Sequence, residues 1–178
     1  MSALHAYADE SLRAGRYLMC LVLVEPRDAG RLRASLQGLL LPRQRRLHFQ
    51  RESRQRRRQI LAAIVDLDVT VAVFTCRHRP GRSERPARDA CLAAIVEHLQ
   101  SLDRDVTLYI ERREGRDGDD HRVVNRSRRP SPALDYQHIL PNDDPLVWLP
   151  DCFAWPVGAG GDWLARVRPA IDVMREVG

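Results

Sequence analysis

The chain has 178 residues, 44% of them hydrophobic, and a formal net charge of +5, so it is long enough for one domain with a substantial core. We find no apolar run of eighteen residues and no basic start followed by an apolar signal core, and we therefore expect a cytoplasmic protein without a membrane partner. The four cysteines are far apart and form no Cys-x-x-Cys pair, which argues against a disulfide framework or a zinc ribbon.

All 29 basic residues are arginine. Arginine makes planar, bidentate contacts to phosphate that lysine cannot make. A basic chain of this kind suits polyanionic partners, and we expect nucleic acid to be the partner. The composition leaves the oligomeric state open.

Within residues 4–11, small or apolar residues alternate until the adjacent acids Asp9 and Glu10, where the pattern stops. This predicts a first strand with an acidic end. Two neighbouring carboxylates repel each other unless water, a cation or an arginine compensates their charge. An exposed strand end is the more common explanation of such a pair. A metal site is the alternative.

The remaining pattern indicates strands that alternate with helices. The apolar run 17–24 predicts a buried second strand, antiparallel to the first. Further strands are predicted at 69–76, 106–111 and 133–140, and helices after Asp28, along 91–102, from Pro150 and along 163–177. This order predicts a single α/β domain over 1–178, with a mixed sheet of about five strands, helices on both faces, and a mobile loop at 112–132.

The segment 43–59 carries eight arginines and continues into apolar residues at helical spacing, which predicts a helix with strongly basic first turns. A solvated face is one interpretation. The other is a surface that contacts phosphates, formed by Arg45, Arg46, Arg54, Arg57 and Arg58.

Three acids occupy positions that the topology would bring together. If the first and fourth strands are parallel neighbours, Asp9 and Glu111 emerge at the same sheet edge. Asp151 would join them from the later helix, although an acid is also favoured in the first turn of a helix on electrostatic grounds alone. Carboxylates from separate elements that converge in this way suit two Mg²⁺ or Mn²⁺ ions and phosphoryl transfer.

Four short motifs carry a resemblance to a known family. They are the opening at 7–11, the Leu-His-Phe step at 47–49, the strand that ends at Glu111, and the segment 149–155. Together they resemble the family called domain of unknown function 3800, which is similar to ribonuclease H-like nucleases. The resemblance implies a ribonuclease H-like fold and metal ligands at Asp9, Glu111 and Asp151, with Glu10 as a possible helper.

The chain departs from the family pattern at three positions. Leu12 replaces a glycine, Pro150 replaces a small residue, and Arg46 replaces the acid that commonly precedes the Leu-His step. The last change leaves the implied metal site one carboxylate short. Glu52 or His48 would then have to supply the missing ligand.

The leading functional hypothesis is a divalent-metal-dependent nuclease that cleaves phosphodiester bonds of RNA or DNA. The alternative is a catalytically inactive nucleic-acid-binding or partner-binding protein on the same fold, in a defence, toxin or mobile-element system. A metal-dependent hydrolase of small phosphates is the third hypothesis.

Overall fold

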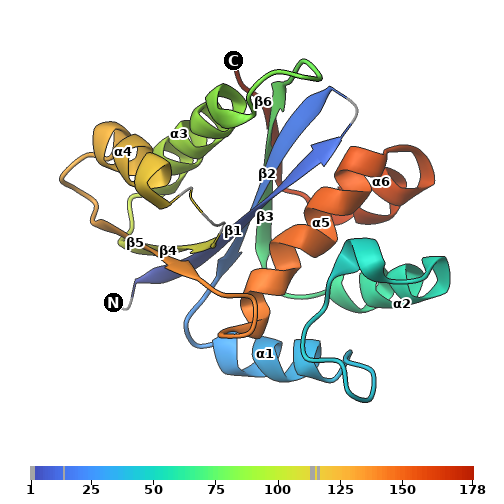
Figure 1. Cartoon of the computed structure of the whole chain (residues 1–178). Helices are drawn as coiled ribbons and strands as arrows, with labels where there is room; N and C mark the ends of the chain where they lie inside the picture. The colour runs from blue at the N-terminus through green and yellow to red at the C-terminus, as the bar shows by residue number, and fades with distance from the viewer. Residues whose placement is uncertain (1–2, 14, 113–114, 116) are drawn as a thin grey trace.

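A six-stranded mixed sheet organises the computed structural model, which describes residues 3–13, 15–112, 115 and 117–178 (Figure 1). Its strands are β1 (Leu4–Arg13), β2 (Arg16–Val24), β3 (Thr70–Arg77), β4 (Val106–Glu111), β5 (Leu134–Ile139) and β6 (Val173–Glu176). They lie in the order β5-β4-β1-β2-β3-β6. The first three strands form an antiparallel meander, and β4, β5 and β6 pair in parallel with their neighbours.

Helices cover both faces of this sheet. One face carries α1 (Ala29–Gln37), α2 (Arg54–Ile64), α5 (Trp148–Ala159) and α6 (Gly161–Val167), and the other carries α3 (Arg85–Ser101) and α4 (Asp117–Ser127). Short 3-10 helices occupy Phe49–Arg51, Pro145–Val147 and Arg168–Ala170. The predicted α/β class and two-faced cover are confirmed, with one strand more than expected.

Successive side chains of β1 alternate between the two faces of the sheet, and this determines the face on which each acid lies. Ala6 and Ala8 pack into the core beneath α3, whereas Tyr7 packs into the core beneath α5. Because successive side chains of a strand point to opposite faces, Asp9 follows Tyr7 onto the α5 face and Glu10 follows Ala8 onto the α3 face.

The parallel pairing of β1 with β4 confirms the predicted neighbourhood of the two acidic strand ends. Its register places Ala8 opposite Ile110, so Asp9 and Glu111 are the next residues of the two strands. The buried run in β2, antiparallel to β1, also follows the prediction. All four cysteines are free and buried.

The segment 112–132 is not the uninterrupted loop that we expected, because it contains α4. The first turn of this helix carries three acids, Asp117, Asp119 and Asp120, and only a few of its residues are buried. A helix with so little apolar surface resembles a polar loop in sequence, although acids favour a helix N-terminus. Residues 113, 114 and 116 of the expected loop lie outside the described residues.

Two other boundaries differ from the expected ones. The basic helix begins only at Arg54, where Ser53 caps it by accepting a hydrogen bond from the Arg56 backbone N–H at 3.2 Å. The closing helix ends at Val167, and the chain then forms β6 beside β3. Pro169 lies in the 3-10 turn between them, and the Asp172 carboxylate accepts a hydrogen bond from the Val71 N–H at 2.8 Å.

Candidate functional site

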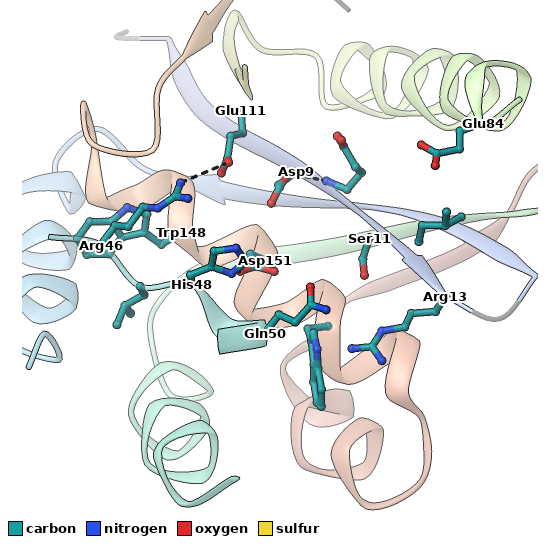
Figure 2. A pocket seen from close by; sticks show the side chains of 14 residues that line it. Asp9, Ser11, Arg13, Arg46, His48, Gln50, Glu84, Glu111, Trp148 and Asp151 are labelled. Carbon is teal, nitrogen blue, oxygen red and sulfur yellow. Dashed lines mark hydrogen bonds and ion pairs between the residues drawn. The ribbon is translucent and has the colours of Figure 1, made fainter. Parts of the chain in front are cut away.

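A pocket of about 420 Å³ lies where the ends of β1 and β4 meet the start of α5 (Figure 2). Its lining includes Asp9, Ser11 and Arg13 from β1, Glu111 from β4, Trp148, Asp151 and Trp155 from α5, and Arg46, His48 and Gln50 from the segment before α2. The three acids expected to converge therefore line the same pocket, with basic side chains around them.

Asp9 is the carboxylate whose protonation the site perturbs most strongly. Burial raises its pKa well above the ordinary value, and the negative charges of Glu111, Glu10 and Asp151 raise it further. One hydrogen bond opposes this shift, because the Glu10 backbone N–H donates to Asp9 Oδ1 at 2.7 Å. A cation beside Asp9 would remove the electrostatic cost of ionising it.

Asp151 is held in a fixed orientation in the first turn of α5. Its Oδ2 accepts a hydrogen bond from the Phe49 backbone N–H at 2.9 Å and lies 3.8 Å from His48 Nδ1. Burial raises the pKa of Asp151, whereas the Phe49 N–H and the nearby His48 and Arg46 lower it, and the rise dominates. The Leu-His-Phe step thus orients the third acid.

Glu111 approaches a cation on the chain itself. The Arg46 Nη1 atom lies 3.9 Å from Glu111 Oε1, and the dashed line in Figure 2 marks this contact. Both side chains are partly exposed, at 36% for Arg46 and 23% for Glu111. Arg46 is therefore an ion-pair partner of a proposed metal ligand.

Glu10 is bound to a network on the opposite face of the sheet. Its carboxylate pairs with Arg88 of α3, which also holds Asp120 through two hydrogen bonds of 2.8 and 2.7 Å. Arg88 further donates to the Tyr17 hydroxyl at 3.1 Å, and His138 Nε2 lies 2.9 Å from Asp120. Glu10 thus fixes the end of β1 against α3, and it also lines the pocket with Asp9, Glu111 and Asp151.

The two candidate replacements for the missing acid have different surroundings. His48 lines the pocket, and its Nδ1 is buried with no hydrogen-bond partner in the described structure. Glu52 contacts Gln44 and lies 3.7 Å from the Arg56 Nε in a neighbouring hollow. Of the two, His48 is the one placed beside an expected metal ligand.

The five predicted phosphate-binding arginines divide into three kinds. Arg46 lines the pocket beside Glu111. Arg57 packs against Trp155, a lining residue, and donates hydrogen bonds to the carbonyls of Phe49 and Gln50. Arg45, Arg54 and Arg58 are exposed. Their role in binding stays a prediction.

Sequence reasoning missed Arg13, Gln50, Glu84 and Trp155, which also line the pocket. For Arg13 a signal was present, because residues 9, 11 and 13 of one strand share a face. Gln50 and Trp155 depend on how the connecting segment packs on α5, which no local pattern reveals.

The donor set suits a hard cation, since carboxylate oxygens are the preferred ligands of Mg²⁺ and Mn²⁺. Among the residues that the structure describes, however, no three histidine, cysteine or acidic side chains are grouped closely enough to bind a metal ion as they stand. Asp9, Glu111 and Asp151 line one pocket, so bringing them to one ion requires side-chain movement and does not require a different fold.

Comparison with solved structures identifies the fold as ribonuclease H-like. The ribonuclease H2 from Pyrococcus horikoshii OT3 superimposes with a TM-score of 0.52 at 12% sequence identity, over 85% of this chain and 70% of that one. No family model and no curated protein matches the chain. The described part of the chain contains no helix long and apolar enough to cross a membrane.

Proposed function

We propose that this protein is a divalent-metal-dependent nuclease that hydrolyses phosphodiester bonds of RNA or DNA. The observation that carries the proposal is the convergence of Asp9, Glu111 and Asp151, from three separate elements, on one pocket. The fold that carries this pocket is similar to that of a ribonuclease H2, and Arg13 and Arg46 also line the pocket. The fold alone would not support the proposal, because one fold hosts many functions.

Asp9, Glu111 and Asp151 would hold the Mg²⁺ or Mn²⁺ ions, with His48 beside Asp151. When bound, such ions activate a water molecule and stabilise the leaving oxygen. The chain's own contribution is to orient the ligands: the Glu10 N–H directs Asp9, and the Phe49 N–H directs Asp151. Glu111 would have to leave Arg46 to join them.

Cleavage of end-labelled RNA, DNA and RNA–DNA hybrid with Mg²⁺, Mn²⁺ or EDTA tests the proposal. We expect strand cutting that requires the metal and stops in EDTA. Mn²⁺ should also raise the melting temperature, because an ion that binds the folded state alone stabilises it by mass action. A folded protein that neither cuts any substrate nor responds to Mn²⁺ would contradict the proposal.

A second candidate function is favoured by the contact between Arg46 and Glu111. A guanidinium here supplies positive charge without a metal ion, as a nucleic-acid-binding or partner-binding protein without catalysis would need. Under this alternative the arginines bind phosphates, and binding weakens steeply with added salt in the absence of any divalent ion.

Arg46→Gln separates the two candidates. Arg46 lies 3.9 Å from Glu111, a proposed ligand, and a unit charge at about that distance in a well-solvated site contributes about 1 kcal/mol, so its removal should raise the Mn²⁺ affinity by about 5-fold. Arg46→Glu should raise it further, because it also adds a carboxylate. Nucleic-acid affinity should fall in both variants.

The measurement is Mn²⁺ binding followed by electron paramagnetic resonance of the free ion, with Arg45→Gln as the matched control. Arg45 neighbours Arg46 in sequence and is exposed, so its loss changes the net charge equally. Equal Mn²⁺ affinity in Arg46→Gln and Arg45→Gln would show that Arg46 does not compete with the metal.

A further inference from the structure

Two guanidinium groups contact one tryptophan beside the proposed catalytic acids. The Cζ of Arg13 lies 4.6 Å from the centroid of the Trp155 ring, and the Cζ of Arg57 lies 4.2 Å from it. Trp155 is only 8% exposed and lines the pocket together with Arg13. An indole ring attracts a cation electrostatically and holds the guanidinium in a restricted orientation.

Arg13 is positioned by its strand and by a glycine. As the last residue of β1 it shares a face with Asp9, and its side chain crosses α5 at Gly158. A Cβ atom at Gly158 would lie 2.7 Å from Arg13 Cγ, a distance that real Cβ contacts essentially never show. The absence of a side chain at this position of the helix therefore gives Arg13 its path to Trp155.

Arg57 lies in α2 and is held by the segment that precedes this helix. Its Nε donates to the Phe49 carbonyl at 2.9 Å, and Nη2 donates to the Gln50 carbonyl. Burial lowers its pKa, and the nearby charge of Arg13 lowers it further, against the attraction of Glu52 and Asp151. The positive charges of Arg13 and Arg57 are thus held close together in a partly buried environment.

Within the described residues, no carboxylate lies within ion-pair distance of Arg13 or Arg57, and Arg13 donates no side-chain hydrogen bond. Its guanidinium donors therefore remain available to a ligand. In Figure 2, Arg13 and Gln50 lie on the side of Asp151 away from Arg46 and Glu111. Arg13 is thus a second basic residue of the pocket, separate from Arg46, and Arg57 lies close to it on the Trp155 ring.

We infer that Arg13 and Arg57, stacked on Trp155, form a subsite for one backbone phosphate of a nucleic-acid strand. The fork of a guanidinium matches the oxygens of a phosphate, and the ligand's negative charge relieves the repulsion between the two arginines. The subsite rests on nucleic acid being the ligand, as proposed above. This subsite defines the path of the bound nucleic-acid strand, which runs from Arg46 past the three acids to Arg13.

The test is binding of fluorescently labelled single-stranded RNA and DNA in EDTA, followed by anisotropy across a salt titration. Loss of one phosphate contact reduces the slope of log affinity against log salt by about 0.7 for a single strand. We expect this reduction, with about 10-fold weaker binding, for Arg13→Gln. Gly158→Ala keeps every charge but displaces Arg13, and we expect it to weaken binding about 3-fold or more.

Arg27→Gln is the control of equal charge. Arg27 is 84% exposed and follows β2, whose end lies at the opposite end of β1 from Arg13. We expect this variant to bind with the parent's slope and affinity. Melting temperatures of all variants, measured alongside, exclude loss of folding as the cause.

The outcomes distinguish this inference from the proposed function. Nucleic-acid binding with a parent-like slope in Arg13→Gln overturns the subsite and leaves the nuclease proposal standing. A reduced slope in a protein that shows no metal-dependent cutting supports the subsite and contradicts the nuclease. Weaker binding of a labelled polyglutamate peptide by Arg13→Gln, with RNA and DNA binding unchanged, overturns the subsite in favour of an acidic protein partner.

Discussion

Arg88→Ala is expected to lower the free energy of unfolding by about 3–5 kcal/mol, the usual effect of removing one partner from a buried charge network. Arg88 is 2% exposed and Asp120 is fully buried, and their two hydrogen bonds join α3 to α4. Although burial raises the pKa of Asp120, the bonds from Arg88 and His138 lower it below its ordinary value. Without Arg88, two carboxylates, Asp120 and Glu10, each lose an ion-pair partner.

Urea unfolding measures this change, and Arg85→Ala is its control. Arg85 lies on the same helix and pairs with Asp119 at 3.2 Å, but its side chain is 46% exposed. An exposed pair contributes at most about 1 kcal/mol, so the control should unfold almost as the parent does. If both variants lost the same small amount, the network would not stabilise the fold as its burial indicates.

The fold was predictable because it follows from local patterns joined by one general rule. Alternation identified β1, a continuous apolar run identified β2, and the right-handed crossover through α3 placed β4 beside β1. The convergence of Asp9 and Glu111 at one edge follows directly. Asp151 was placed by its position in the first turn of the helix that packs over that edge.

The partners of individual side chains were not predictable in this way. Glu10 lines the pocket with the other acids, but no local pattern indicated that Arg88, 78 positions away in sequence, would pair with it. The stacking of Arg13 on Trp155 depends on the absence of a side chain at Gly158. Such contacts arise from packing between distant elements, and a single sequence carries no periodic signal for them.

The stretch that was most misleading in sequence is 112–132. The helix α4 within it buries Asp120 together with Val123 and Val124, and Asp120 is paired with Arg88 of α3. Hydrophobic periodicity detects helices that pack through apolar side chains. It does not detect one that is joined to its neighbour by a buried ion pair.

Asp9→Asn is expected to have two opposite effects, loss of function and gain of stability. Cleavage should fall by at least about 100-fold, since the variant removes one charged ligand from the proposed metal site. The melting temperature at neutral pH should rise by about 2–5 °C. The reason for the second effect is that the native fold raises the pKa of Asp9 by burial and by the charges of Glu111, Glu10 and Asp151.

The pH dependence follows from the direction of that shift. The folded protein retains the Asp9 proton at pH values where the unfolded chain has released it, so stability declines as pH rises above about 4 toward the raised pKa. Asp9→Asn should remove this decline. Asp144→Asn is the opposite control: burial raises the Asp144 pKa, but Arg33 and the Leu146 N–H lower it overall, so that variant should destabilise the fold at neutral pH.

Thermal unfolding of the parent and both variants between about pH 4 and 8 measures these effects, without metal and again with Mn²⁺. We expect Mn²⁺ to stabilise the parent and Asp144→Asn but not Asp9→Asn, because only the last lacks the carboxylate that the ion would neutralise. A destabilised Asp9→Asn would show that Asp9 is structural. A stabilised Asp9→Asn that still cuts nucleic acid would place the catalytic metal, and with it the nuclease site, elsewhere on the chain.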